Sequence, residues 1–317
     1  MKQSKKRRGA VIPYDYEAAF PSVLEDHGES ASDYLEALRS RRDIYATKEI
    51  RAGEQLEVEI YPEFRKGQRA EIPPEALKKK QKKAQQNLND RNSRKQCERV
   101  INENFGDRDI WATFTYSNDE IPASMEEALR NMKNYIRRVN RKRKQLGLPN
   151  ARYVYVTECS PSGRWHHHIV MDGDLDMDTV ESLWTKGKRN QVRRLEKDEN
   201  GLSGMAHYLT KEPKGAKRWT PSKGLRQPSE RVNHQKFQRK EVRQMIEDAD
   251  AVKPLMEKWY AAEGYVYTSS VIRYNDVNGR FYIYARLRKP PDKKQRKEGQ
   301  TCKYRPRGIR KEWSGWA

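Results

Sequence analysis

The chain has 317 residues, of which 66 are Lys or Arg and 45 are Asp or Glu, so its formal net charge is +21 at pH 7. Only 35% of the residues are hydrophobic and no run of about eighteen apolar residues occurs, which argues against a membrane-spanning helix and against export. The three cysteines lie far apart at Cys97, Cys159 and Cys302, so they exclude a disulfide framework and a Cys-x-x-Cys metal site and fit a reducing cytosol.

The first hundred residues predict a hairpin and a basic helix. Residues 1–42 are polar and show no period typical of a helix or a strand. Residues 44–64 predict two strands that join at Gly53, because apolar and acidic side chains alternate until Pro62. Residues 75–102 are rich in Lys, Gln and Arg with widely spaced apolar positions, which predicts a basic helix with a thin apolar stripe.

A strand and a long amphipathic helix come next. Residues 109–116 predict the strand. Ser124 and Glu127 have the spacing of a capping box, in which each side chain accepts a hydrogen bond from the other's backbone N–H. Behind this box apolar residues recur at steps of three and four up to Lys144, and Gly147 ends the pattern. We expect one face of this helix to pack against a sheet.

Three more strands and two shorter helices complete the middle of the chain. Residues 153–158 and 165–171 predict a hairpin joined by a tight polar turn. A helix over 179–186, a strand over 192–195 and a helix over 202–211 follow. The order strand, helix, strand, strand, helix, strand, helix predicts an α+β sandwich built on an antiparallel sheet.

The last hundred residues show weaker patterns. Residues 213–240 are rich in Pro, Lys and Gln, which predicts a linker. A helix over 252–262 follows. The strands predicted for 265–272 and 281–287 flank the sequence Asp-Val-Asn-Gly that ends at Gly279, a strong hairpin signal.

These patterns divide the chain into three regions. Residues 1–105 form a basic N-terminal region with a hairpin and a helix, and residues 106–225 form the predicted α+β domain. Residues 226–317 contain a linker, a helix, a hairpin and a basic tail. The candidate chemistry lies in the middle region.

Three consecutive histidines lie on the predicted strand 165–171. Side chains alternate along a strand, so His166 and His168 share one face while His167 points to the other. Two imidazoles at this spacing can chelate one ion, and Glu158 on the preceding strand is a candidate third ligand if the hairpin register places it beside His166. The alternative is a polar strand face, with Glu158 as an edge charge.

Tyr208 is the candidate nucleophile on the helix predicted for 202–211. Tyr208 and Lys211 are three residues apart and share a helix face. A phenol with a pKa near 10 attacks poorly unless a cation assists it, and Lys211 supplies a positive charge. Tyr-x-x-Lys alone occurs by chance in basic proteins, so its value lies in following the histidine strand by about forty residues.

The excess of positive charge points to polyphosphate partners, because each Lys or Arg placed at a phosphate releases condensed counterions. The basic stretch of the predicted helix 75–102 includes Lys79 and Lys83. A second cluster includes Arg137, Arg141 and Arg143. Both clusters are candidates for DNA phosphate contacts, and a solvated helix face is the equally simple alternative.

Three motifs occur in a fixed order along residues 109–212: Phe-Thr-Tyr at 114–116, Trp-His-His-His-Ile-Val at 165–170, and Tyr-Leu-Thr-Lys at 208–211. This arrangement resembles the HUH-superfamily rolling-circle replication initiators (Rep proteins). It is most similar to those of small single-stranded DNA phages and of plasmids and phage-like elements in Gram-positive bacteria. The resemblance implies a ferredoxin-like antiparallel sheet with flanking helices, an HUH endonuclease core, plus N- and C-terminal extensions.

The resemblance also implies a role for each residue. His166 and His168 would bind Mg2+ or Mn2+, with Glu158 as the third ligand. Tyr208 would attack the scissile phosphorus and form a 5′-phosphotyrosine, leaving a free 3′-OH. Lys211 would neutralise or position the phosphate. The activity implied is sequence-specific nicking and joining of single-stranded DNA that initiates rolling-circle replication.

Two departures from the family pattern affect the prediction. The residue between the two ligating histidines is usually bulky and hydrophobic, and here it is His167, which either packs or competes as a ligand if the strand is bulged. Glu212 and Gly204 stand where some phage initiators have a second tyrosine. With one tyrosine, termination would need a second protomer, hence a possible dimer, or a water activated by a carboxylate.

The resemblance implies specific partners. They are single-stranded or cruciform origin DNA and a host DNA polymerase in the cytoplasm of a bacterial cell. A host helicase is also expected, because no Gly-x-x-x-x-Gly-Lys-Ser/Thr motif occurs in the chain. Two alternatives remain open: a single-tyrosine HUH transposase, and a non-catalytic basic nucleic-acid-binding protein whose histidines are structural.

Overall fold

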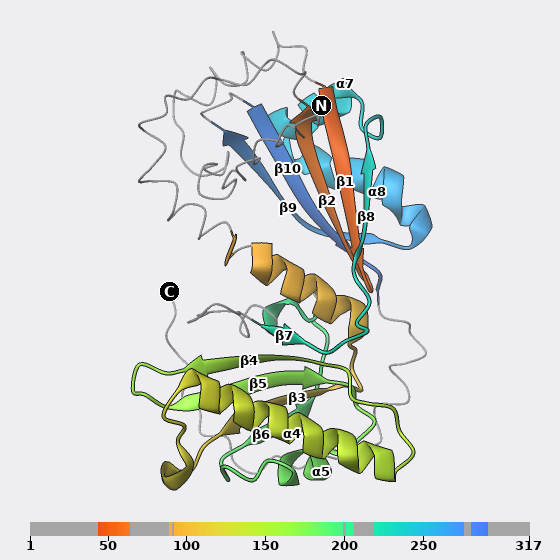
Figure 1. The fold of residues 1–317 in the computed structure, drawn as a ribbon. Coiled ribbons are helices and arrows are strands. Elements are labelled where there is room, and N and C mark those ends of the chain that lie inside the picture. The colour runs from red at the N-terminus through yellow and green to blue at the C-terminus, as the bar shows by residue number, and fades with distance from the viewer. Residues whose placement is uncertain are drawn as a thin grey trace, which may run out of the picture.

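The computed structural model describes residues 44–63, 89–90, 92–198, 201–205, 219–275 and 280–290. Within these residues the chain forms two antiparallel five-stranded sheets with flanking helices, so the predicted α+β class is confirmed (Figure 1). None of the helices described is both long enough and apolar enough to span a membrane.

The second sheet has the element order that the sequence predicts. Its elements are β3 (Ile110–Thr115), η1 (Asn118–Glu120), α4 (Met125–Gln145), β4 (Tyr153–Cys159), β5 (Trp165–Met171), α5 (Met177–Ser182), β6 (Gln191–Arg194) and β7 (Thr220–Pro221). The strand order is β6-β3-β5-β4-β7 with antiparallel neighbours. Without the short edge strand β7, this is the βαββαβ arrangement of a ferredoxin-like sheet.

Helix α4 begins as its sequence predicts, with one difference. Ser124 Oγ accepts a hydrogen bond from the backbone N–H of Glu127 at 3.3 Å. The Glu127 carboxylate accepts from the backbone N–H of Ala123 at 2.8 Å instead of from Ser124, so the reciprocal bond of the capping box reaches one residue further back. The buried apolar stripe consists of Ala128, Met132, Tyr135, Ile136 and Val139. This stripe holds α4 against the sheet.

Alternation along the strands gives the second sheet two different faces. The face toward α4 and α5 is apolar and includes Ile110, Ala112, Phe114, Tyr155, Ile169 and Met171. The other face carries Trp111, Val154, Val156 and Val170, which pack with Cys97, Val100 and Ile101 of the helical residues 92–104. Odd-numbered residues of β5 therefore face α4, and even-numbered residues lie on the opposite side.

The first sheet is assembled from both ends of the chain. Its strands are β1 (Ile44–Ala52), β2 (Gln55–Glu63), β8 (Ser229–Asn233), β9 (Val266–Asn275) and β10 (Arg280–Arg288), in the order β8-β1-β2-β10-β9. Its helices are α7 (Arg239–Glu247), η2 (Ala249–Ala251), α8 (Val252–Tyr260) and η3 (Ala261–Glu263). The two predicted hairpins are confirmed, and β2 of the first pairs with β10 of the second.

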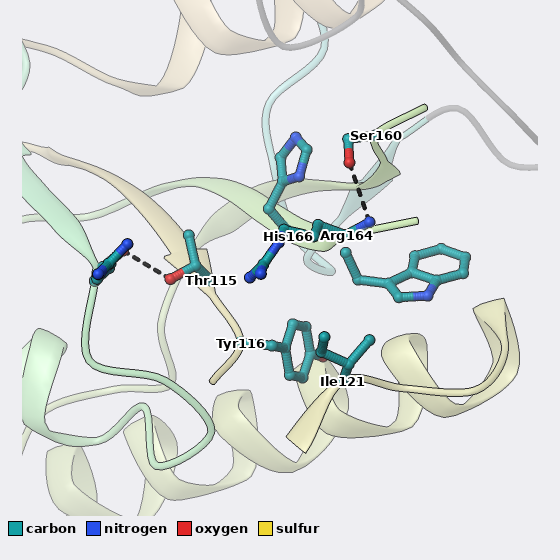
Figure 2. Close-up of a pocket in the computed structure, with 8 residues that line it drawn as sticks. Thr115, Tyr116, Ile121, Ser160, Arg164 and His166 are labelled. Atoms are coloured by element: carbon teal, nitrogen blue, oxygen red, sulfur yellow. Dashed lines mark hydrogen bonds between the residues drawn. The ribbon is translucent and has the colours of Figure 1, made fainter. Parts of the chain in front are cut away.

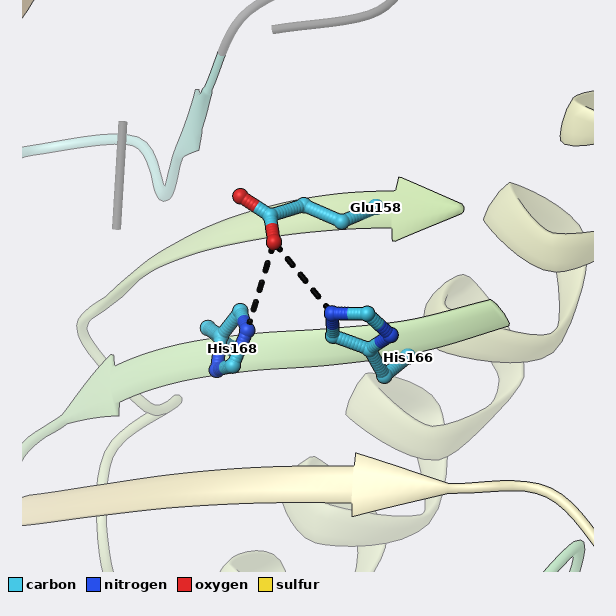
Figure 3. A group of neighbouring side chains, drawn as sticks. All are labelled: Glu158, His166 and His168. Carbon is cyan, nitrogen blue, oxygen red and sulfur yellow. Dashed lines mark hydrogen bonds and ion pairs between the residues drawn. The ribbon is translucent and has the colours of Figure 1, made fainter. Parts of the chain in front are cut away.

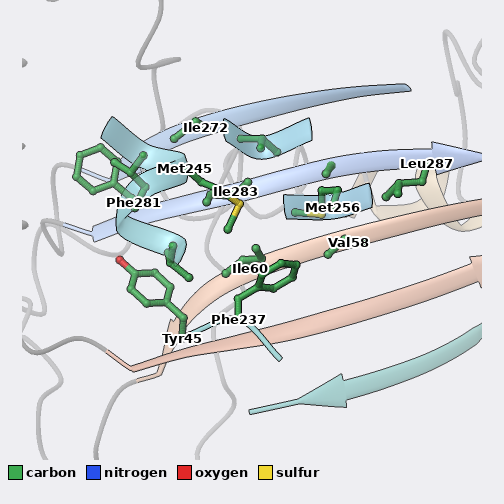
Figure 4. Packing of buried hydrophobic residues seen from close by; sticks show 14 of the residues in the cluster. Tyr45, Val58, Ile60, Phe237, Met245, Met256, Ile272, Phe281, Ile283 and Leu287 are labelled. Atoms are coloured by element: carbon green, nitrogen blue, oxygen red, sulfur yellow. The ribbon is translucent and has the colours of Figure 1, made fainter. Parts of the chain in front are cut away.

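One face of the first sheet is covered by α7 and α8. The core between them includes Val58, Ile60, Met245, Met256, Ile272 and Ile283 (Figure 4). The apolar residues of β2 and β10 alternate with polar ones, because only this face of the sheet is packed against helices.

The helical residues 92–104 contact both sheets. Arg99 donates to both carboxylate oxygens of Glu57 on β2, at 3.0 and 2.7 Å, and the other side of the helix packs on the second sheet. Gly53, at the turn between β1 and β2, also meets this helix. A Cβ at Gly53 would lie 2.2 Å from the carbonyl oxygen of Asn102, and its φ is +57°, so only glycine fits there.

The prediction of a linker over 213–240 is wrong for its described part. Residues 220–221 form β7, residues 229–233 form β8, and α7 begins at Arg239. The sequence gives no strand signal for β8 because it is an edge strand with almost all its side chains exposed, joined to β1 by backbone pairing. Helix α5 is also two residues earlier and shorter than the predicted 179–186.

Several predicted elements lie partly or wholly outside the described residues. The basic helix is helical at 89–90 and 92–104, and the stretch before residue 89 is not described. The helix predicted for 202–211 is helical at 203–205, and residues 206–211 are not described. The turn at 276–279 and the tail from 291 also lie outside the described ranges.

Candidate metal centre

The hairpin of β4 and β5 brings three ligand-type side chains together on one face of the second sheet. Glu158 pairs directly with His166, and Val156 pairs with His168. Glu158 Oε2 lies 3.2 Å from His166 Nε2 and 3.5 Å from His168 Nε2 (Figure 3). The three candidate ligand atoms lie within 4.8 Å of one another, so this cluster could hold a metal ion.

Strand β3 supports His168 from the other side. Thr113 is the cross-strand partner of His168, and its Oγ1 lies 3.0 Å from His168 Nδ1. The ring of Trp111 stacks on the imidazole with 5.5 Å between centroids. A proton on Nδ1 that is donated to Thr113 leaves the Nε2 lone pair directed at Glu158, the form in which imidazole binds a cation.

The donor set fits a divalent cation. Burial alone raises the pKa of Glu158, but hydrogen bonds and charges from His166 and His168 outweigh burial and lower it to about 2. The carboxylate is therefore ionised at neutral pH. Its second oxygen, Oε1, is buried and has no hydrogen-bond partner among the described residues. Two imidazole nitrogens and a carboxylate oxygen suit a divalent metal with further coordination positions for water or phosphate oxygens.

His167 belongs to the opposite face and packs in the core. Its side chain is fully buried, with Thr157 Oγ1 at 2.9 Å from Nδ1 and Tyr116 Oη at 2.8 Å from Nε2. Burial, together with the charges of His166 and His168, lowers the pKa of His167 to about 3. The β4–β5 register is continuous, so no bulge turns this ring toward the ligand cluster. His167 therefore fills the position of a hydrophobic residue.

A small cavity opens beside His166 at the start of β5. Its volume is about 310 Å³, and it is lined by Thr115, Tyr116, Ile121, Ser160, Arg164, Trp165, His166 and Arg189 (Figure 2). Arg164 and Arg189 are exposed, whereas Trp165 is half-buried. A cavity with an aromatic wall and two guanidinium groups suits part of a nucleotide adjoining the metal centre.

The predicted nucleophile Tyr208 and its neighbour Lys211 lie outside the described residues. The chain is described up to Met205 and again from Trp219. Both of these side chains pack against the cluster that includes Trp111, and Trp219 Nε1 donates to Ser93 Oγ at 3.0 Å. The two ends of the segment that contains Tyr208 therefore lie on the face of the sheet that carries the ligand cluster.

The prediction that Arg143 contacts DNA is wrong. Its side chain is 1% exposed and forms ion pairs with Asp172 and, at 2.7 Å, with Asp174, while Nε donates to the carbonyl of Pro149. An arginine whose donors are all directed at internal acceptors is not available to a phosphate. Its place in a run of basic residues suggested a surface position, but Asp172 at the end of β5 draws it into the domain.

Arg137 and Arg141 are exposed, but on the side of the domain away from the ligand cluster. Both lie on the outer side of α4, which covers the α4-facing side of the sheet. Any DNA contact there would be remote from the candidate metal centre. Lys79 and Lys83 lie outside the described residues.

Sequence reasoning missed Trp111 and Thr113, which support His168. Both lie at odd positions of β3, so alternation puts them on one face. A signal was therefore present, but its use required knowing that β3 pairs with β5, which the chain order does not give.

Residues 109–213 match a family model for replication-associated proteins of the ORF2 type. The match covers about a third of the chain, from β3 to the segment beyond β6, and includes Glu158, His166, His168 and Tyr208. Neither a curated protein nor a solved structure matches the chain. The match supports a role in replication initiation and in binding DNA. It does not extend to the first sheet.

Proposed function

We propose that this chain is a metal-dependent DNA nickase and strand transferase that initiates rolling-circle replication. The observation that carries the proposal is the convergence of Glu158, His166 and His168 on one sheet face, inside the segment that matches a replication-associated family. A histidine pair supported by Thr113 and completed by a carboxylate is better suited to binding a cation than to filling a polar strand face.

In the proposed reaction Tyr208 Oη attacks the phosphorus of one phosphodiester in single-stranded origin DNA. The bond from phosphorus to the 3′ oxygen breaks, the tyrosine loses its proton, and the 3′ oxygen gains one. The products are a 5′-phosphotyrosine and a free 3′-OH, and attack by a 3′-OH on the same phosphorus rejoins the strand. Mg2+ or Mn2+ held by Glu158, His166 and His168 would supply charge stabilisation at the phosphate oxygens.

The packing of Met205 supports the reach of Tyr208. Met205 packs against the cluster that contains Trp111, and Trp111 stacks on His168. Tyr208 follows Met205 by three residues, a span of at most about 11 Å even if fully extended. Lys211 follows Tyr208 by a further three residues, and we assign it to the phosphate. A DNA polymerase of the host would extend the 3′-OH, and a host helicase would unwind the duplex.

Covalent capture of DNA tests the proposal. The full chain is incubated with Mn2+ and a random-sequence pool of single-stranded DNA, and the DNA that remains attached after denaturation is sequenced. We expect a covalent adduct at one preferred sequence, lost in Tyr208→Phe and lost with EDTA. Tyr267→Phe is the matched control, because Tyr267 lies in the first sheet, where its hydroxyl donates to Ser270.

The same assay separates the alternatives. Equal labelling of the wild type and Tyr208→Phe, or none in either, would leave a non-catalytic nucleic-acid-binding protein. An adduct that forms at the ends of a mobile element and joins them would favour the transposase. The number of protomers in the adduct-forming species would show whether a dimer supplies the second tyrosine needed to end a round of replication.

A further inference from the structure

A second cavity lies far from the ligand cluster, between the first sheet and the helical residues 92–104. Its volume is about 650 Å³, within the range of about 300 to 1,000 Å³ typical of ligand sites. Its walls come from β1, β2, β9, β10 and that helix. The residues of β2 and β10 that enter it alternate with the core residues packed on α7 and α8, so it occupies the opposite face of the sheet.

The lining of this cleft is basic and aromatic. Five of its fourteen lining residues are basic, three are tyrosines and one is acidic: Lys48, Lys95, Arg99, Arg273 and Arg286, then Tyr61, Tyr282 and Tyr284, then Glu59. Tyr282 and Tyr284 are two apart on β10 and share its cleft face. Interleaved cations and aromatic rings are what a strand with unpaired bases requires, since phosphates take the charges and bases stack on the rings.

Three of the basic residues are held by carboxylates. Arg99 is locked by Glu57, Arg286 reaches Glu98 at 3.3 Å, and Lys48 reaches Glu230 at 2.8 Å. These pairs fix the walls of the cleft and leave little net charge on those three side chains.

Arg273 and Lys95 are placed beside the two tyrosines of β10. Arg273 has no hydrogen bond or ion pair to any described residue, and on β9 it is the cross-strand partner of Tyr282. Lys95 Nζ lies 5.0 Å from the centre of the Tyr284 ring. Each of these tyrosines is thus accompanied by a cation, an arrangement that pairs one phosphate contact with one stacking surface.

We infer that this cleft binds single-stranded DNA, through phosphate contacts by Arg273 and Lys95 and stacking of bases on Tyr282 and Tyr284. The choice of DNA rests on the proposed function, whereas the single-strand preference rests on the cleft itself. The helical residues 92–104 connect the two sites, since one side of this helix lines the cleft and the other packs on the metal face of the second sheet. A strand leaving the nicking site would continue into the cleft.

Binding measurements without metal test this inference separately from catalysis. A labelled thirty-nucleotide oligo-dT is titrated with the full chain in EDTA at several salt concentrations, on a Tyr208→Phe background. We expect Arg273→Ala to weaken binding about tenfold and to lower the slope of log affinity against log salt by about 0.7, the loss of one single-strand phosphate contact. Tyr282→Leu should weaken binding at least fivefold with the slope unchanged, and Tyr282→Phe should bind like its parent.

Arg231→Ala is the matched control. Arg231 is exposed on β8 and is the partner of Glu49, so it lies on the opposite face of the same sheet and loses the same charge. Unchanged affinity in both Arg273→Ala and Tyr282→Leu, an equal loss in Arg231→Ala, or equal competition by polyglutamate would each overturn the cleft assignment. A failure of Tyr208-dependent adduct formation with these binding effects intact would overturn the nicking proposal alone.

Discussion

The two sheets of this chain are built in opposite ways. The second sheet forms from consecutive elements between residues 110 and 194, with β7 added at one edge. The first sheet places β1 and β2 from the start of the chain beside β8, β9 and β10 from its end. The segment that matches a known family covers the second sheet and none of the first. Local order in the chain thus accompanies the recognisable chemistry, and the first sheet frames it with distant segments.

The two sheets also differ in their buried ionic groups. In the second sheet Arg143 and Asp172 form a buried pair on the α4 side, and Asp172 also accepts from the backbone N–H of Arg152 at 2.6 Å. In the first sheet buried Glu49 receives Lys236, Arg51 and the Tyr260 hydroxyl. Each domain therefore has its own polar anchor, so each can be weakened separately.

The largest expected effect comes from breaking the Arg143 anchor. Arg143→Met would leave the Asp172 carboxylate buried without its charged partner, which typically destabilises a domain by about 3 to 5 kcal/mol. Residue-resolved amide hydrogen exchange of the full chain should show lost protection in β3, β4, β5 and α4. Protection in β1, β2, β9 and β10 should be retained.

Arg152→Ala is the control for this variant. Arg152 Nε lies 3.9 Å from the same aspartate, but its side chain is 50% exposed. Exposed pairs contribute at most about 1 kcal/mol, so exchange in the second sheet should change little. If both variants were equally mild, the burial of Arg143 would have no energetic meaning and the contrast between the sheets would fail.

The second expected effect is a difference in acid sensitivity. His167 is buried with a pKa of about 3, below its ordinary value of 6.5, so between these values the unfolded chain binds a proton that the folded chain does not. Its contribution is fully present above pH 6.5. As the pH falls through this window, the second sheet should lose about 1.4 kcal/mol of stability per unit.

The first sheet provides the comparison within the same molecule. Its described part contains one histidine, His234, and that side chain is exposed. Denaturant unfolding followed by hydrogen exchange at pH 7, 6 and 5 should therefore show a decline confined to the second sheet. His167→Leu should flatten that decline, even though it removes the partners of Thr157 and Tyr116. An equal decline in both sheets would contradict this assignment.

A smaller effect should distinguish the two faces of β5. Thr113 contacts His168 on the metal side, and Thr157 contacts His167 on the core side, each through a hydroxyl at about the same distance. Thr113→Val should weaken Mn2+ binding about 10- to 100-fold in calorimetry, because it removes the group that orients a ligand. Thr157→Val should leave Mn2+ affinity within about twofold. Equal losses would mean that general destabilisation, not ligand orientation, lowers the affinity.

These contrasts explain which parts of the structure could be predicted from the sequence. The pairing of Glu158 with His166 followed from a short hairpin and from alternation, both of which are local. The role of Thr113 depends on the insertion of β5 between β3 and β4, which no local pattern specifies. Arg143 was misassigned for the same reason, since its partner Asp172 is distant in the chain.

The first sheet was harder to predict because much of it is held by backbone pairing. The hairpins gave clear alternation, but their union through β2 and β10 is a long-range event. Strand β8 has almost no buried side chain, so its sequence lacks the apolar signal by which strands are recognised. Helix α7 carries the buried residues Val242, Met245 and Ile246, but the charged residues around them obscured this stripe.

The smallest expected effect tests whether backbone pairing is sufficient at that edge. Glu230 on β8 pairs with Lys48 on β1 at 2.8 Å, with both side chains partly exposed. Glu230→Gln should reduce the stability of the first sheet by less than about 1 kcal/mol, because solvent screens such a pair. Amide exchange at residues 229–233 should remain as slow as in the wild type. Rapid exchange there would mean that the ion pair, rather than the backbone ladder, holds β8 against β1, and the edge would then depend on side chains as the second sheet does.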